Sequence, residues 1–302
     1  MSIPAETFEL PGGGRIPAAY RSLRTRSDVH VVAEVPAAPY FGERADALPM
    51  YFSTAHWKRT VEGYTSYFAP TYNFIKWRLS HFPDDGSIRF LRRFGVDTVV
   101  VKPDDSKKLP PWLGPDPRWE TTPFPEGHVA LRLVGAPAEP FEPPPTDEAG
   151  LFEIGRDGWS VQASRPGAER ATDGDAATVW VTGRAQVAGD FFRIRFRGPV
   201  VVRRISMGLR TPLHPQSYEF AMHLAVFGKA EKGEDWEEVP FDEESAYDRL
   251  FAGLLHRPQA ATFDVDIEPR TLKALELRVT KTDAFWMPWT LPEIRVYGSV
   301  SR

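Results

Sequence analysis

Apolar and polar residues alternate with a period of two through most of the second half of the chain. The clearest alternating runs lie at 192–196, 205–209, 218–226, 263–267, 275–279 and 294–296. Successive side chains of a β-strand point to opposite faces of the sheet, so this alternation predicts strands with one buried and one solvated face. Helical periodicity is nearly absent from this half. We therefore expect it to fold as an antiparallel β-sandwich.

The first half of the chain shows a mixture of patterns. Residues 72–82 have apolar side chains at helical spacing, and Asp84 or Asp85 can cap a second helix that Gly95 ends. Short apolar or alternating runs predict strands at 30–35, 96–101, 119–124 and 128–134, the last two as a hairpin turned at 125–127. Helices interspersed with strands indicate a small α/β domain with a mixed sheet.

A proline-rich segment at 136–147 separates the two patterns. Proline lacks an amide hydrogen and fixes its own backbone angle, so this segment should be extended and semi-rigid. The predicted organisation is an α/β domain at 1–135, a linker at 136–147 and a β-sandwich at 148–302. The predicted fold class is α+β, in two domains that we expect to fold independently.

Composition excludes several classes of protein. The 302 residues include no cysteine, which excludes disulfides, thiol nucleophiles and thiolate metal sites. The formal net charge of −4 divides evenly between the two halves, so neither half has the basic surface that nucleic-acid binding needs. No run of eighteen apolar residues is present, and we expect no transmembrane segment in this chain.

No catalytic motif outweighs a simpler interpretation of the same residues. His56 lies among aromatic and polar residues and could act as a general base, but a histidine hydrogen-bonded in a packed aromatic loop gives the same pattern. Glu34 and Asp46 could form the carboxylate pair of a glycoside hydrolase, although nothing in the sequence brings them together. The motifs of serine hydrolases, phosphate-binding loops and zinc proteases are missing. We assign no catalytic residue, and a hydrolase is the least favoured function.

Four motifs follow one another in the second half. They are Ala171-Thr-Asp-Gly-Asp-Ala-Ala-Thr-Val-Trp180, Phe191-Phe-Arg-Ile-Arg-Phe196, Gln216-Ser-Tyr-Glu-Phe220 and Leu291-Pro-Glu-Ile-Arg-Val-Tyr-Gly298. In this order they resemble the discoidin family, also called the coagulation factor 5/8 type C domain, which is close to the galactose-binding-like carbohydrate-binding modules. The resemblance covers residues 150–300 and implies a discoidin-like β-sandwich of the jelly-roll type.

The resemblance also implies a metal site at the first motif. In the resembled modules this acidic turn, its threonine and a glutamate near the end of the domain enclose a structural calcium ion. The matching residues here are Asp173, Asp175, Thr178 and Glu293. Calcium takes several oxygen ligands, which a tight acidic turn can present. The alternative is an Asp-Gly turn held by its own side-chain hydrogen bonds. We expect Trp180, just after the turn, to be a core residue.

Two loops of the predicted sandwich combine aromatic and polar residues, as sugar-binding sites do. They are 210–216 and 281–289, and the candidate contacts are Arg210, His214, Trp286 and Trp289. One alternative is that the two tryptophans only cover the end of the core. Another is that the apolar tip of the second loop, around Trp286, inserts into a bilayer.

The first domain resembles a second family. Its segments 31–36, 51–58, 61–65 and 87–101 are similar to the soluble extracytoplasmic tail of bacterial membrane glycosyltransferases of the GT-C type. In that family the catalytic aspartate lies in an early loop between transmembrane helices, which has no counterpart in this sequence. The resemblance therefore implies a non-catalytic part of such an enzyme.

Together these patterns favour a module that recognises or positions a glycan or polysaccharide. The two resemblances place it outside the cytoplasm, in the periplasm or cell envelope of a bacterium, beside a membrane glycosyltransferase bundle. The alternative is a protein-interaction or scaffolding module whose sandwich binds no sugar. A wet, aromatic-lined loop pocket would favour the glycan, and a flat apolar patch would favour the scaffold.

Overall fold

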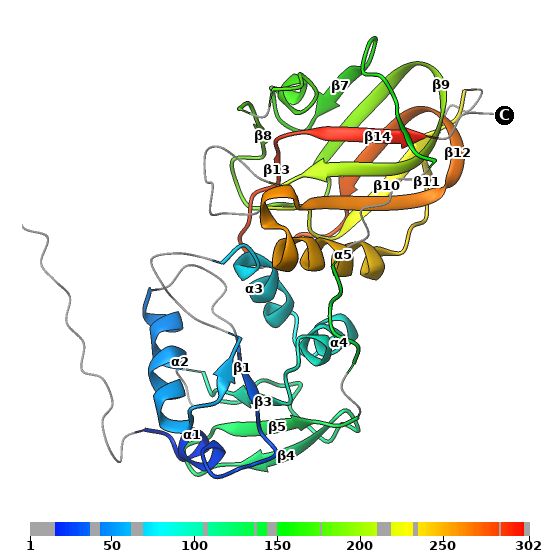
Figure 1. Cartoon of the computed structure of the whole chain (residues 1–302). Helices are drawn as coiled ribbons and strands as arrows, with labels where there is room; N and C mark the ends of the chain where they lie inside the picture. Colours follow the sequence, from blue (N-terminus) through cyan, green and yellow to red (C-terminus); the bar gives the residue numbers. More distant parts are fainter. Residues whose placement is uncertain are drawn as a thin grey trace, which may run out of the picture. The chain divides into compact units, whose positions relative to one another are not determined.

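The structure is a computed structural model of the whole chain. It describes residues 16–36, 43–61, 69–104, 108–135, 138–143, 150–175, 177–209, 219–231, 235–283 and 285–298, without the side chains of 43–49. The chain divides into two compact units, drawn in Figure 1. The first unit comprises Met1–Thr65 and Arg78–Pro140, and the second comprises Ser66–Trp77 and Phe141–Arg302.

A five-stranded sheet forms the centre of the first unit. Its strands are β1 (Val31–Val35), β2 (Arg59–Thr60), β3 (Thr98–Val101), β4 (Trp119–Pro123) and β5 (Val129–Leu133). They lie in the order β2-β1-β3-β5-β4, with β2, β1 and β3 parallel and the other pairs antiparallel. The predicted mixed sheet and its β4–β5 hairpin are confirmed. Every residue of β1 and β3 is buried, as expected for strands covered on both faces.

Helices complete the first unit. They are α1 (Ala18–Leu23), α2 (Glu43–His56) and α4 (Asp85–Arg93). Tyr20 of α1 and Phe52 of α2 pack in one core cluster with Val32 and Val100 of the sheet. The caps of α4 are as predicted: the Asp84 carboxylate accepts a hydrogen bond from the Ser87 amide at 2.6 Å, and Gly95 has a left-handed φ of 81°. Within the described residues, none of the helices combines the length and the apolar character that a transmembrane span requires.

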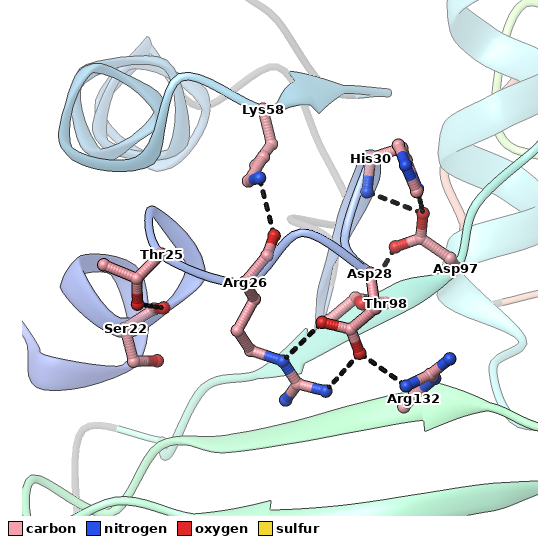
Figure 2. A network of polar contacts seen from close by, with 9 residues as sticks. All are labelled: Ser22, Thr25, Arg26, Asp28, His30, Lys58, Asp97, Thr98 and Arg132. Atoms are coloured by element: carbon pink, nitrogen blue, oxygen red, sulfur yellow. Dashed lines mark hydrogen bonds and ion pairs between the residues drawn. The ribbon is translucent and has the colours of Figure 1, made fainter.

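A polar network surrounds the start of β1 (Figure 2). The Asp97 carboxylate accepts hydrogen bonds from the His30 amide at 2.7 Å and from its ring nitrogen Nδ1 at 3.2 Å. Asp28 forms ion pairs with Arg26, at 2.8 Å, and with Arg132. The hydrogen bond from Arg26 lowers the pKa of Asp28 to about 2, so this carboxylate stays ionised. The network fixes the entry of the chain into the sheet.

Two long antiparallel strands organise the second unit, β9 (Phe191–Gly208) and β12 (Thr262–Val279). Shorter strands join them: β6 (Phe152–Glu153), β7 (Ser160–Ala163), β10 (Leu224–Lys229), β11 (Glu237–Glu238) and β14 (Ile294–Gly298). A separate antiparallel pair consists of β8 (Trp180–Val181) and β13 (Thr290–Leu291).

The pairing of β9 with β12 explains how a single hydrogen-bonded sheet supplies both layers of the sandwich. Residues 191–195 pair with 274–278, and β7 and β10 extend this half of the sheet. Residues 204–208 pair with 262–266, and β14 and β6 extend the other half. Between the halves the register shifts twice, and Figure 1 shows both long strands curving at the same end. The fold class is therefore as predicted, an α/β unit with a mixed sheet and a β-sandwich.

Helix α5 (Glu243–His256) of the second unit was not predicted, because helical periodicity is nearly absent from the sequence pattern of this half. Asp242 caps this helix by accepting a hydrogen bond from the Ser245 amide at 3.0 Å. The predicted strand at 218–226 is also partly wrong, because β10 begins only at Leu224. The backbone of His223 has a φ of 48°, which a strand residue does not adopt.

The segment 66–77 belongs to the second unit, whereas the sequence placed it in the first domain. It includes the start of α3 (Tyr72–Ser80), which confirms the predicted helix at 72–82. The Phe74 ring lies 5.5 Å from Phe220 and 5.1 Å from Phe251 of α5, and Trp77 lies 4.8 Å from Tyr247. This segment thus fills part of the core beneath α5. Independent folding of the two units stays a prediction.

Candidate functional site

The acidic turn before β8 gathers oxygen atoms around one hydroxyl. Thr178 Oγ1 lies 2.8 Å from Asp173 Oδ2, 3.0 Å from the carbonyl oxygen of Arg170 and 3.1 Å from that of Asp175. A hydroxyl has one hydrogen and can donate to only one of these three oxygens. The Asp175 amide donates to Asp173 Oδ1 at 2.9 Å, and this bond lowers the pKa of Asp173. Ionised and carbonyl oxygens are the ligand types that a hard divalent cation takes, but Asp173, Asp175 and Glu293 are not among the described groups whose ligand atoms converge as a metal site.

Glu293, the fourth predicted ligand, has a protein partner. Nη1 of Arg156 donates to its Oε1 at 2.5 Å and lies 3.4 Å from the carbonyl oxygen of Thr172, beside the turn. Burial raises the pKa of Glu293, and the negative charge of Asp173 adds to the rise. The structure therefore brings Glu293 to the neighbourhood of the turn. Sequence reasoning missed Arg156, which is 137 positions away from Glu293.

The two tryptophans of the 281–289 loop have different environments. Trp289 is only 1% exposed, and its ring packs edge to face on Trp180 at 5.2 Å. The prediction that Trp289 contacts a ligand is wrong, because its ring is enclosed in the core together with Trp180. Trp180 is a core residue as predicted. Trp286 is 40% exposed and stays a candidate contact, while Arg210 and His214 lie outside the described residues.

Buried polar groups hold the base of this loop. The Gln186 amide nitrogen donates to the carbonyl oxygen of Phe220 at 2.7 Å and to that of Pro288 at 3.3 Å, and its oxygen accepts from the Met222 amide. Asp283, also buried, contacts Nε2 of His223 at 2.7 Å. Three segments of the sandwich therefore converge on one polar core beneath the loop.

An open cavity of about 390 Å³ lies between β8 and the loop that follows β7. Its wall combines two arginines with apolar and small residues: Arg165, Pro166, Arg170, Val179, Trp180, Val181, Thr182 and Gly183. Gly167 turns the chain with a left-handed φ of 87° just before the short helix η2 (Ala168–Ala171), which places both arginines on the same cavity. The Trp180 indole nitrogen donates to the Arg165 carbonyl oxygen at 3.1 Å and holds this loop against the core.

The side chains of Arg165 and Arg170 form no ion pair or hydrogen bond with any residue that the structure describes. Some other arginines of this unit are paired, such as Arg184 with Asp190 and Arg204 with Asp266. Two exposed guanidinium groups on one cavity can bind an oxyanion such as a carboxylate. Sequence reasoning missed this site because no motif contains both arginines and their neighbours are not distinctive.

Two of the catalytic candidates of the first unit, His56 and Glu34, contact other residues of the protein. Nδ1 of His56 accepts a hydrogen bond from the Lys58 amide at 2.9 Å, and burial lowers the pKa of His56 to about 4. The buried carboxylate of Glu34 accepts a hydrogen bond from the Tyr20 hydroxyl at 2.9 Å and pairs with Lys102 at 3.3 Å. The side chain of Asp46 lies outside the described residues. His56 and Glu34 thus each have a hydrogen-bond partner within the protein.

No protein-family profile matches the chain, and no curated protein matches it in sequence. Solved structures that are similar include the F5/8 type C domain of a Bacteroides fragilis protein, with 16% identity, a TM-score of 0.37, and 50% of this chain and 98% of that one covered. The family 32 carbohydrate-binding module of Clostridium perfringens NanJ, in complex with galactose, has 13% identity and a TM-score of 0.35, with 49% and 98% covered. Chitosan-binding module 1 of a Paenibacillus chitosanase/glucanase has 18% identity and a TM-score of 0.33, with 46% and 94% covered. At these values no ligand or residue role transfers to this chain.

Proposed function

We propose that the chain is a non-catalytic module that recognises a glycan through the cavity beside β8. The observation that carries the proposal is the pair of guanidinium groups, Arg165 and Arg170, which have no partner among the described residues. Unpaired arginines on one concave surface favour a ligand with its own negative charge. The favoured ligand class is therefore an acidic glycan, bearing a carboxylate, sulfate or phosphate group.

The rest of the cavity suits a sugar ring, because Pro166, Val179 and Val181 supply apolar surface. Because the cavity is open, a sugar there would bury little area and would exchange hydrogen bonds with water for bonds with the protein. We expect dissociation constants of about 10 μM to 1 mM, equivalent to roughly −7 to −4 kcal/mol.

The resemblance of the first domain supports a cellular setting for this module. We propose that it acts in the bacterial envelope, outside the cytoplasm, as the soluble part of a membrane glycosyltransferase or as its accessory. The glycan would then be the substrate or product strand that the enzyme handles. The residues that support this setting are the segments 31–36, 51–58, 61–65 and 87–101.

A binding measurement on the full chain tests the glycan proposal. Uronate, sulfated and neutral oligosaccharides would be screened on an array, and each hit would be titrated by calorimetry against Arg165→Gln and Arg170→Gln. Each variant should weaken binding of the acidic ligand by about tenfold, because a charged hydrogen bond contributes about 1.5 to 3 kcal/mol. Arg203→Gln is the matched control, since Arg203 is an exposed arginine of β9 that does not line the cavity.

The controls separate the two candidate functions. Unchanged melting temperatures with weaker binding in the two cavity variants, and normal binding in Arg203→Gln, would support the glycan site. Absence of binding to every glycan, or equal binding in all variants, would remove the cavity from the proposal. The scaffolding function would then take first place.

Calcium is the cofactor that we propose for the turn, with Asp173, Asp175, Thr178 and Glu293 as its ligands. It would join the loop before β8 to the end of the sandwich through shared oxygen ligands. Calcium should raise the melting temperature of the wild type relative to chelator, because a ligand of the native state stabilises it by mass action. Asp173→Asn should lose this increase, and Asp157→Asn, at an exposed aspartate outside the turn, should keep it. Superimposable wild-type melting curves in calcium and chelator would contradict the site.

A further inference from the structure

Strand β9 presents a row of arginines on its outer face. The positions between them are buried in the core, namely Phe192, Ile194 and Phe196. Because successive side chains of a strand point to opposite faces, Arg193, Arg195 and Arg197 share the other face. Two-residue steps along a strand measure about 7 Å, so the row extends over roughly 14 Å.

Arg195 and Arg197 are the exposed members of this row. Neither side chain has an ion pair or a hydrogen bond with a residue in the described part of the chain. The aliphatic stem of Arg197 packs against the chain at Gly158, where a built Cβ atom would lie 3.1 Å from Cβ and Cδ of Arg197. The stem is therefore held on the sheet, and its guanidinium is left to solvent or to a ligand.

Arg193, at the other end of the row, is anchored on the sheet. Its Nε donates to the Glu276 carboxylate at 2.8 Å, and the rings of Phe191 and Trp236 lie 4.9 Å and 4.8 Å from its guanidinium. Glu276 is buried and also pairs with Arg278. One carboxylate between two guanidinium groups leaves one positive charge, so the row stays positive along its length.

The row leads to the cavity of the proposed glycan site. Strand β7 pairs with β9 in antiparallel register, with Ser160 opposite Arg195. Beyond β7 the Ser164 amide still donates to the carbonyl oxygen of Phe191 at 3.0 Å. The next residue, Arg165, therefore lies just past the end of the row, where it lines the cavity beside β8. The arginines of β9 and of the cavity thus follow one line on this unit.

We infer that the acidic glycan of the cavity is a polymer, and that Arg195 and Arg197 bind the anionic groups of its further units. The inference rests on the proposed glycan site, because it extends the ligand from the cavity along β9. Guanidinium groups at regular spacing complement a chain that carries a carboxylate or a sulfate on successive units. A disaccharide in the cavity is too short to reach Arg197, so these contacts require a longer chain.

Calorimetric titration of the full chain with acidic disaccharides and octasaccharides, both uronates and sulfated sugars, tests this inference. The wild type should bind the octasaccharide of one series at least about tenfold more tightly than its disaccharide, because each exposed charge pair contributes roughly a two- to fivefold factor. The double variant Arg195→Gln/Arg197→Gln should lose most of this gain and bind the disaccharide as the wild type does. Added salt should reduce the gain in the wild type, because it screens exposed charges.

The matched control removes two exposed arginines from the other half of the sheet. Arg203→Gln/Arg295→Gln has the same net charge as the test variant and should keep the full gain with chain length. Melting temperatures equal to that of the wild type in both double variants would show that a loss of affinity is a loss of contacts.

Several results would overturn the inference. Equal affinity for short and long chains would do so, although disaccharide binding would still support the cavity. A gain that survives in Arg195→Gln/Arg197→Gln would also contradict it, as would binding of poly-glutamate as tight as that of the octasaccharide, because the surface would then respond to charge alone. Absence of binding to every glycan would overturn it together with the proposed function.

Discussion

The buried imidazole of His56 gives the first unit a dependence on pH. Its pKa is about 4 in the folded chain and 6.5 in a free side chain, so between these values the unfolded chain binds a proton that the folded chain does not. Stability should therefore fall as the pH decreases from about 6.5 to 4, by roughly 2 to 3 kcal/mol for this group.

His56→Asn tests this expectation, because asparagine can still accept the hydrogen bond of the Lys58 amide but does not titrate. The variant should be less stable at pH 7.5, and the difference from the wild type should narrow at pH 4.5. Urea unfolding at the two pH values measures both free energies. A difference that stays constant would show that the folded chain protonates His56 readily.

The two tryptophans of the 281–289 loop should respond differently to truncation. Trp289→Ala should cost about 3 to 5 kcal/mol, because it leaves a cavity beside Trp180 in the core. Trp286→Ala should change the free energy of unfolding by less than about 1 kcal/mol, because the ring is partly exposed. Thermal and urea unfolding of both variants give the comparison. Equal destabilisation would mean that both rings belong to the core.

Residues close in sequence were the ones whose contacts could be predicted. The contact of Thr178 with Asp173 follows from the geometry of a short turn, which five positions suffice to define. The pair of Arg156 with Glu293 depends on how β14 returns beside the loop before β7, and no local pattern contains that information. The cavity arginines, Arg165 and Arg170, were missed for a different reason. Their distinction is that both line one cavity, which only a folded structure reveals.

At the scale of elements, local signals predicted those helices and strands whose ends are marked. The helix α4 was found because Asp84 and Gly95 stand at its two ends. The helix α5 has a comparable cap at Asp242, with Ala246, Leu250 and Leu254 on its buried face, but it lies among strands and was overlooked. Alternation alone extended β10 too far, because residues 219–223 alternate without pairing. There the chain is fixed by buried side chains, such as that of Gln186, rather than by a neighbouring strand.

At the scale of the whole molecule, the boundary at the proline-rich segment predicts that a 148–302 fragment folds by itself. The structure leads to a different expectation, because Phe74 and Trp77 fill the core beneath α5. Loss of each buried aromatic side chain costs about 3 to 5 kcal/mol, and domains have only about 5 to 15 kcal/mol in total. A 138–302 fragment should therefore melt well below the second unit of the full chain. A synthetic peptide of residues 66–80, added in excess, should raise its melting temperature.

The matched control is the same peptide with alanine at Phe74 and Trp77, which should have no effect. Calorimetry and near-ultraviolet circular dichroism would follow the fragment with each peptide. A fragment that melts cooperatively at the full-chain temperature without any peptide would restore the simple boundary between the domains.

One residue belongs to both proposed sites of the sandwich. The backbone carbonyl of Arg170 is part of the oxygen cluster at the turn, while its side chain lines the cavity. A cation that immobilises this carbonyl would also reduce the motion of the short helix η2. The guanidinium of Arg170 would then lose less conformational entropy when it binds its ligand. By reciprocity, an acidic sugar held by Arg170 would raise the affinity of the turn for calcium by the same factor. The affinity of the protein for the glycan would then depend on the calcium concentration around the cell, and Arg170 alone would couple the two.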